Sequence, residues 1–128
     1  MMKILVVDDE RDIQTLFEQR FRKEIRDKFL EFAFAFSGED ALTYLNQHKH
    51  ETVLILSDIN MPGMSGLELQ RQLAADHNRT PIVFITAHND PGSRALALQA
   101  GAVAFLSKPF KEEALFEAIR SAIEPRRG

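Results

Sequence analysis

The sequence predicts an α/β fold in which a doubly wound, five-stranded parallel sheet has the strand order 2-1-3-4-5. Five short apolar runs alternate with amphipathic helical patterns along the 128 residues. Three of these runs, residues 4–7, 53–56 and 82–85, are apolar without alternation, which is typical of strands buried on both faces of a parallel sheet. Strict alternation of strands and helices favours crossover helices on both faces of one sheet, and this strand order is a common solution for five strands.

A long helical pattern follows the first strand, residues 4–7. Its apolar residues recur at helical spacing and form one face: Ile13, Leu16, Phe17, Phe21, Ile25 and Phe29. In the second strand, residues 32–36, phenylalanine alternates with alanine, which predicts that the rings share one packed face. Ser37, with Asp40 three residues later, predicts the start of the second helix.

The third strand is predicted at residues 53–56, all of them core positions. Ser65 and Glu68 then repeat the signal for a helix start. The fourth strand follows at residues 82–85.

The last two helices have start and stop signals of their own. Asp90 and Pro91 place a cap and then a proline at a helix start, and Gly101 stands where that helix would stop. The fifth strand is predicted at residues 103–106. The helix after it carries its apolar face at Leu115, Ala118, Ile119, Ala122 and Ile123.

The composition bounds the class of protein. The chain is 45% hydrophobic, with 16 basic and 19 acidic residues, a net charge of −3 and no cysteine. This excludes disulfides and cysteine-ligated zinc, and mild acidity gives no reason to expect direct binding of nucleic acid or of a membrane. We expect a soluble, cytoplasmic protein with one domain over residues 1–124, a tail or linker start at 125–128, and no output domain.

Polar side chains stand at the predicted carboxyl ends of four strands. Asp8 and Asp9 follow the first strand, Asp58 follows the third, Thr86 follows the fourth and Lys108 follows the fifth. Ligands of doubly wound sheets bind at this edge, at the point where the strand order reverses. Converging carboxylates repel each other, and a hard divalent cation such as Mg²⁺ relieves that repulsion while leaving positions for phosphate oxygens. Carboxylate, metal, ammonium and hydroxyl together suit a phosphoryl group in transfer.

In four stretches the sequence resembles the receiver domain of bacterial two-component response regulators. They are VVDDE at residues 6–10, SDINMPGMSG at 57–66, ITA at 85–87 and GAVAFLSKPF at 101–110. The similarity covers essentially the whole chain, and the four stretches at these spacings are highly specific as a set. The resemblance implies a flavodoxin-like (βα)5 fold.

The resemblance assigns a role to each polar residue of the strand ends. Asp58 would be the phosphoacceptor and nucleophile. Asp9 and Asp58 would bind Mg²⁺, or Mn²⁺ in its place, together with the backbone carbonyl of Asn60, whereas Asp8 would act mainly through a bound water. Lys108 would bridge to the acyl phosphate.

Five further assignments follow from the resemblance. Thr86 and Phe105 would be the switch residues, with Thr86 bonding a phosphoryl oxygen and Phe105 swinging inward. Asn60 and His88 would tune the rate at which the phosphoryl group is lost, although His88 fits a surface loop equally well. The bond before Pro109 would be cis.

The implied partners are a sensor histidine kinase or a phosphotransfer protein as donor and an unidentified downstream protein. The face formed by the fourth helix, the fifth strand and the fifth helix would change its partner affinity on phosphorylation, and it could also support a phosphorylation-dependent homodimer. We expect no separate turnover substrate, so the protein would not be an enzyme beyond its own phosphorylation and dephosphorylation.

Three other functions fit the residues less well. A phosphatase with an aspartate nucleophile usually has an Asp-x-Asp pair after the first strand and a cap, for which this length leaves no room. A flavin-binding module needs hydroxyl and amide donors where Asp8 and Asp9 would repel the phosphate. A degenerate receiver used only for docking would not need the intact acidic, hydroxyl and lysine set.

The sequence departs from the usual receiver pattern in residues 10–31. This stretch is several residues longer than is common, which predicts an extended first helix that alters kinase docking. Its basic residues alternate with acidic ones, so we interpret it as a solvated, charge-paired face and not as a nucleic-acid patch.

Overall fold

The computed structural model describes residues 2–48, 51–86, 91–108 and 111–123. Within these ranges the elements are, in order, β1 (Met2–Val7), α1 (Asp12–Arg20), α2 (Arg22–Arg26), β2 (Leu30–Ala35), α3 (Gly38–Gln47), β3 (Leu54–Ser57), α4 (Gly66–Ala75), β4 (Ile82–Thr86), α5 (Pro91–Gln99), β5 (Ala104–Ser107) and α6 (Glu112–Ile123).

The five strands form one parallel sheet in the order β2-β1-β3-β4-β5, which confirms the predicted topology. Its register decides which side chains meet at the carboxyl edge. Val7 pairs with Ser57, so the residues that follow them, Asp8 and Asp58, leave neighbouring strands side by side. Thr86 pairs with Ser107 in the same way, at the ends of β4 and β5.

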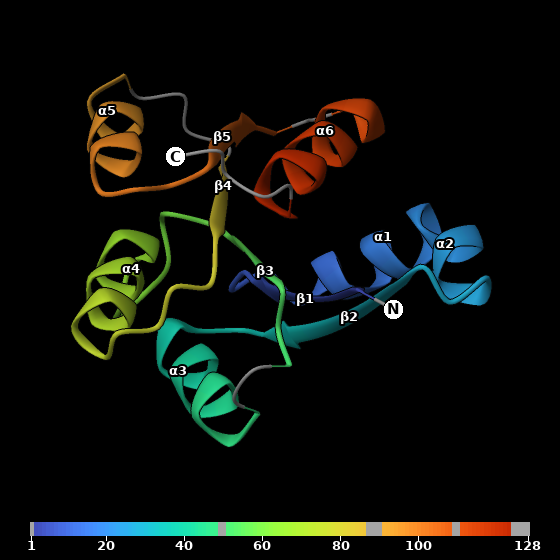
Figure 1. The fold of residues 1–128 in the computed structure, drawn as a ribbon, viewed down its shortest axis with the longest axis horizontal. Coiled ribbons are helices and arrows are strands. Elements are labelled where there is room, and N and C mark those ends of the chain that lie inside the picture. The colour runs from blue at the N-terminus through green and yellow to red at the C-terminus, as the bar shows by residue number, and fades with distance from the viewer. Residues whose placement is uncertain (1, 49–50, 87–90, 109–110, 124–128) are drawn as a thin grey trace.

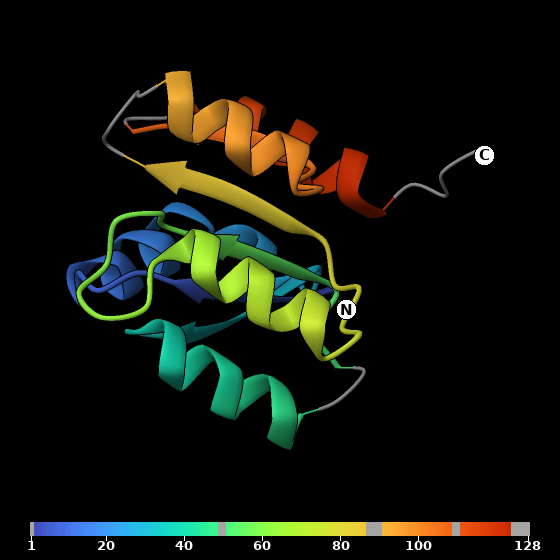
Figure 2. The same cartoon turned by 90° about the vertical axis from the view of Figure 1, so that its left-hand side faces the viewer.

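Helices cover both faces of the sheet, as Figure 1 shows, with α3, α4 and α5 on one side and α1, α2 and α6 on the other. Figure 2 shows α3, α4 and α5 lying one above the other across their face. Each face has its own apolar core. Leu5, Ile55 and Phe84 pack toward α3, α4 and α5, whereas Ile4 and Leu56 pack toward α1 and α6.

The predicted helix starts are found where the sequence signals them. The Ser37 Oγ accepts a hydrogen bond of 3.0 Å from the amide of Asp40, and the Ser65 Oγ accepts one of 3.2 Å from the amide of Glu68. Helix α5 begins at Pro91, and Gly101 follows its end with φ +104°, whereas the predicted cap residue Asp90 lies outside the described residues. The two serine cap bonds satisfy amides at the helix starts that have no partner inside the helix.

The prediction of one extended first helix is wrong. The segment forms α1 and the short α2, separated at Phe21, whose φ of −110° and ψ of 25° depart from the helical values. Two residues of the predicted apolar face lie in solvent, because Leu16 is 45% exposed and Phe29 is 65% exposed. Lys28, at φ +62°, ends the helical stretch and turns the chain into β2, which carries Phe29 off the apolar face.

Phe21 is buried completely at this break, and aromatic packing accounts for its position. Its ring lies 5.7 Å from that of Phe17, 5.6 Å from that of Phe32 and 5.5 Å from that of Phe116. These rings come from α1, β2 and α6, so they join elements across one face of the sheet. The rings of β2 do share that face, as predicted, while Ala35 packs on the opposite one.

The predicted core position Val53 is corrected as well. It precedes β3 and is 37% exposed, whereas the next three residues, at 54–56, are fully buried. Burial in a parallel sheet begins only where strands lie on both sides, and the pairing of β3 with β1 begins at Leu54.

Candidate functional site

Three carboxylates meet at the carboxyl edge between β1 and β3. Asp8, Asp9 and Asp58 each bring one carboxylate oxygen into a group whose members all lie within 4.8 Å of one another. Asp8 is 3% exposed and Asp58 is 8% exposed, while Asp9 lies on the surface. The backbone holds the two buried residues in place, because the amide of Asp8 donates to the carbonyl of Ala35 and that of Asp58 donates to the carbonyl of Val7.

Lys108 brings a positive charge to this group from the end of β5. Its Nζ donates hydrogen bonds of 2.7 Å to Asp8 Oδ2 and 3.3 Å to Asp58 Oδ2. Burial lowers the pKa of Lys108, but the hydrogen bond that Lys108 donates to Asp8 and the charges of Asp58 and Asp8 outweigh this effect, so the pKa is raised above 10.5. Lys108 is therefore an ammonium ion at neutral pH.

The loop after Asp58 controls how its carboxylate is presented. The amide of Asn60 donates a hydrogen bond of 3.2 Å to Asp58 Oδ1, which leaves Oδ2 facing Lys108. The Ser57 hydroxyl, at the buried end of β3, donates a hydrogen bond of 2.9 Å to the carbonyl oxygen of Asp58. Gly66 also lies against that carbonyl, because a Cβ at this position would be 2.3 Å from the Asp58 oxygen.

Ser57 and Gly66 belong to the site although no sequence motif assigns them to it. A hydroxyl inside an otherwise apolar strand is the signal that could have indicated Ser57. Gly66 gave no comparable signal, because its need for space comes from a close backbone approach that only the fold creates.

The three carboxylates fit a hard divalent cation. Mg²⁺ prefers oxygen ligands and is usually bound through one or two carboxylates with several waters retained. A buried pair beside an exposed third carboxylate provides such ligands and leaves one side open to solvent. Asp8, Asp9 and Asp58 are thus the residues that could hold Mg²⁺.

The sequence around this site matches a known protein family. Residues 4–120 match the family described as the response regulator receiver domain. The chain belongs to this family. As a receiver domain of a two-component response regulator, it serves phosphorylation-dependent signalling, and receiver domains bind Mg²⁺ at an acidic pocket and interact with histidine kinases.

Curated relatives are longer proteins. The receiver domain is 34% identical over 124 residues to the C4-dicarboxylate transport transcriptional regulatory protein DctD of Rhizobium meliloti, covering 97% of this chain and 26% of DctD. It is 34% identical over 123 residues to the transcriptional regulatory protein CpxR of Klebsiella pneumoniae, covering 96% of this chain and 50% of CpxR. Against the response regulator TodT of Pseudomonas putida it is 47% identical over 70 residues, or 55% of this chain and 31% of TodT. The chain thus spans half of these relatives' length or less.

Solved structures share the fold across nearly the whole receiver domain. A receiver domain protein from Clostridium thermocellum has a TM-score of 0.80 at 27% identity, with 96% of this chain and 94% of that chain covered. The chemotaxis protein CheY4 of Vibrio cholerae has a TM-score of 0.80 at 28% identity, with coverage of 96% and 99%.

The two expected switch residues of the receiver domain are both buried. Thr86 is 1% exposed at the end of β4, and its carbonyl accepts a hydrogen bond of 2.8 Å from the amide of Lys108. Phe105 is 9% exposed and packs in the core that faces α3, α4 and α5. His88 and Pro109, for which roles in dephosphorylation and a cis bond were predicted, lie outside the described residues.

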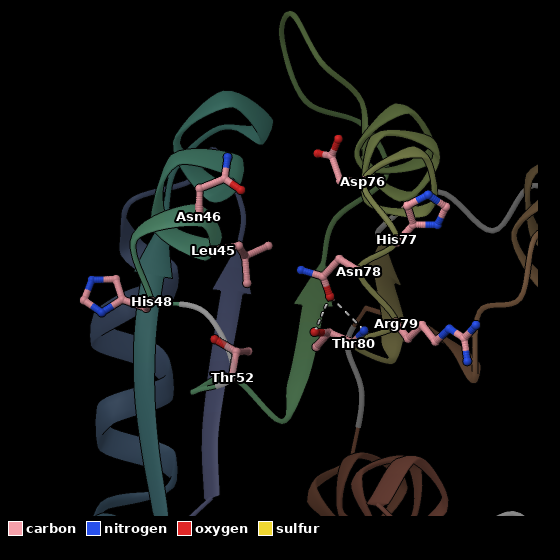
Figure 3. A pocket seen from close by; sticks show the side chains of 9 residues that line it. All are labelled: Leu45, Asn46, His48, Thr52, Asp76, His77, Asn78, Arg79 and Thr80. Carbon is pink, nitrogen blue, oxygen red and sulfur yellow. Dashed lines mark hydrogen bonds between the residues drawn. The ribbon is translucent and has the colours of Figure 1, made fainter.

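A pocket lined by residues 45, 46, 48, 52 and 76–80 lies at the other edge of the sheet. It has a volume of about 610 Å³ and lies between the ends of α3 and α4, beside Thr52 and Thr80, which precede β3 and β4. Figure 3 shows Asn46 and Asp76 on opposite sides of it. Since the carboxylate group lies at the carboxyl ends of the strands, this pocket is not part of the candidate site.

No helix in the described ranges is long and apolar enough to cross a membrane.

Proposed function

We propose that Asp58 accepts a phosphoryl group from a phosphohistidine of a sensor histidine kinase or a phosphotransfer protein. The observation that carries the proposal is the position of Asp58, whose Oδ2 lies 3.3 Å from the Lys108 ammonium within a group of three carboxylates. The Asp58 side chain is 10% exposed, so only a small part of it is accessible to a donor.

In the proposed step, an Asp58 carboxylate oxygen supplies the electron pair for a new O–P bond. The N–P bond of the donor breaks, its electron pair stays on the imidazole nitrogen, and that nitrogen takes up a proton. Phosphoryl transfer depends mostly on positioning and on charge stabilisation. The hydrogen bond from the Asn60 amide to Oδ1 holds the nucleophile in one orientation for this step.

Lys108 and Thr86 would serve the transferred group. The ammonium of Lys108 already contacts Asp58 Oδ2 and would neutralise charge on the phosphoryl oxygens. Thr86 would donate its hydroxyl to one of those oxygens, and its backbone bond to Lys108 keeps the two residues together.

Bound Mg²⁺, or Mn²⁺, would neutralise negative charge on the carboxylates and on the incoming phosphoryl oxygens. In this proposal Asp9, Asp58 and the backbone carbonyl of Asn60 are its ligands, and Asp8 acts mainly through water. The grouping of the three carboxylates supports this ligand set. The chain would catalyse only its own phosphorylation and dephosphorylation.

We further propose that phosphorylation changes the face formed by α5, β5 and α6. These elements are the fourth helix, fifth strand and fifth helix expected from the sequence. Leu96 is 54% exposed and Leu98 is 43% exposed on α5, and covering this apolar area with a partner would be favourable. Thr86 and Phe105 connect the site to this face, since they lie on the paired strands β4 and β5. A downstream protein or a second copy of the chain would bind there. A phosphorylated protein that keeps its monomer mass in solution would contradict the homodimer.

The phosphoacceptor is tested by intact-protein mass after incubation with acetyl phosphate, with and without Mg²⁺. The variants are Asp58→Asn and the matched control Asp76→Asn, which alters an exposed aspartate beside the pocket at the opposite edge. We expect one phosphoryl adduct on the wild type and on the control, dependent on Mg²⁺, and none on Asp58→Asn. An adduct that persists in Asp58→Asn, or a folded wild type that gains none, would overturn the proposal.

A further inference from the structure

The loop of residues 59–65, which follows the proposed phosphoacceptor, is closed by two hydrogen bonds near its ends. The amide of Asn60 donates to Asp58 Oδ1 at 3.2 Å, and the amide of Gly66 donates to the carbonyl of Ile59 at 2.9 Å. Ile59 is buried, which anchors the first half of the loop in the core. The second half extends over the surface through Gly63, which has φ +76°.

A residue from a distant element holds this second half. The Glu39 Oε1, in the first turn of α3, accepts a hydrogen bond of 3.2 Å from the amide of Met64, which is 25 residues later in the sequence. The other carboxylate oxygen, Oε2, lies 3.3 Å from where a Cβ on Gly63 would stand. The Glu39 carboxylate thus lies against two consecutive residues of the loop.

Side-chain packing supports the same contact. A Cβ on Gly38 would lie 2.8 Å from Met64 Cγ, so the Met64 side chain rests directly on the first residue of α3. Met64 is therefore held to α3 twice, through its amide by Glu39 and through its side chain by Gly38. Because α3 itself packs on the sheet through the buried residues Ala41 and Leu45, the loop is tied to a rigid element.

We propose that Glu39 is a positioning residue for phosphorylation at Asp58. By fixing Met64, Glu39 holds the loop so that the Asn60 peptide keeps its amide on Asp58 Oδ1 and its carbonyl available to the divalent cation. The inference rests on the proposed function of Asp58, which it deepens by naming a residue outside the strand ends. Such supporting residues matter because an acceptor group and metal ligands must be held within a fraction of an ångström.

The neighbouring acid Asp40 provides a matched control. Both acids lie in the first turn of α3, where a negative charge stabilises the helix start to a similar degree. The backbone amide of Asp40 donates a hydrogen bond to the Ser37 Oγ, whereas the side chain of Glu39 accepts one from the loop. Removing either carboxylate changes the net charge equally, but only Glu39→Ala removes the bond to Met64.

The experiment compares wild type, Glu39→Ala, Glu39→Gln and Asp40→Ala. Calorimetric titration gives the dissociation constant for Mg²⁺, and hydrogen exchange in Mg²⁺-free protein gives the protection of the Met64 amide. For Glu39→Ala we expect Mg²⁺ binding about threefold to tenfold weaker and faster exchange at Met64, because the loop loses its anchor. Asp40→Ala should stay within about twofold of the wild type in both. Glu39→Gln keeps an acceptor oxygen and should restore most of the loss.

A merely structural role would lower the thermal midpoint of Glu39→Ala and leave its Mg²⁺ dissociation constant equal to that of Asp40→Ala, which overturns the inference. If Glu39→Ala does not fold, a Glu39→Gln protein whose Met64 amide exchanges faster than in the wild type, but whose Mg²⁺ dissociation constant equals that of the wild type, overturns it as well. Acetyl phosphate labelling separates the two claims. If the wild type is labelled and the Glu39 variants are labelled to the same extent, only the role of Glu39 is removed. If the wild type is not labelled, the proposed function of Asp58 is removed.

Discussion

Lys108 Nζ donates a hydrogen bond of 2.7 Å to Asp8 Oδ2, joining residues that are 100 positions apart. The same nitrogen is 3.3 Å from Asp58 Oδ2, so the lysine lies closer to the flanking carboxylate than to the proposed phosphoacceptor. Asp8 is almost completely buried, and Lys108 supplies a counter-charge that a buried carboxylate requires.

Replacing Lys108 with methionine should destabilise the Mg²⁺-free protein. The change leaves the carboxylates at Asp8 and Asp58 without their shared cation, and we expect a loss of about 1–3 kcal/mol in the free energy of unfolding. Mg²⁺ should raise the melting temperature of Lys108→Met by more than that of the wild type, because the ion replaces the missing charge. Thermal melts with and without Mg²⁺ test this. Equal Mg²⁺ increments in the two proteins would contradict it.

The stabilising contribution of Lys108 should depend on pH in the alkaline range. Despite the lowering effect of burial, the hydrogen bond that Lys108 donates to Asp8 and the nearby charges raise the pKa of Lys108 in the folded state above the ordinary 10.5. A raised pKa means that the contribution is complete below the unfolded value and is lost as the pH rises through the folded one. Urea unfolding of wild type and Lys108→Met in Mg²⁺-free buffer should therefore give a difference that is constant up to about pH 9.5 and shrinks above about pH 10.5. A difference that shrinks in the neutral range would show another group at work.

Substituting Gly66 with alanine should disturb the backbone at Asp58. A Cβ there would stand 2.3 Å from the carbonyl oxygen of Asp58, so the start of α4 or the end of β3 must shift. We expect a cost of about 1–3 kcal/mol and slower labelling by acetyl phosphate. Gly38→Ala is a comparison and not a neutral control. Gly38 also follows a serine cap and opens a helix, but its Cβ would displace only the flexible side chain of Met64, so we expect a smaller effect on labelling. Urea unfolding and mass labelling compare the two, and a larger effect of Gly38→Ala on labelling would contradict the expectation.

The break between α1 and α2 predicts that alanine substitution of two phenylalanines lowers stability by very different amounts. Phe21→Ala removes a completely buried ring that contacts Phe17, Phe32 and Phe116, and should cost about 3–5 kcal/mol. Phe29→Ala alters a ring that is 65% exposed and should change stability by no more than about 0.5 kcal/mol. Chemical unfolding of both variants measures the difference. Similar costs would indicate that Phe29 packs in a continuous helix with Phe21, as the sequence pattern suggested.

The sequence predicted the sheet because its signals are local. An apolar run without alternation identifies a strand that is buried on both faces, and Ser37 and Ser65 identify helix starts through bonds that span three residues. The polar residues at the strand ends could also be predicted to share one edge, because parallel strands all end on the same side. None of these signals depends on a contact between distant residues.

The apolar spacing through Phe29 was misleading because it too is a local signal. Periodicity continues across Phe21 and Lys28, but packing of the Phe21 ring and the left-handed turn at Lys28 interrupt the helix. Spacing reports which side chains could share a face, whereas the path of the backbone depends on what those side chains meet. Only the aromatic neighbours from β2 and α6 decided that.

By itself the sequence determined the fold class, the order of its elements and the set of residues gathered at the carboxyl edge. The tertiary structure alone decided that Lys108 lies nearest Asp8, that Gly66 is pressed against the Asp58 carbonyl and that Glu39 holds Met64. These relationships link residues from separate elements, and their distances depend on how helices pack on the sheet. Local patterns specify which elements form, and packing specifies which of their side chains meet.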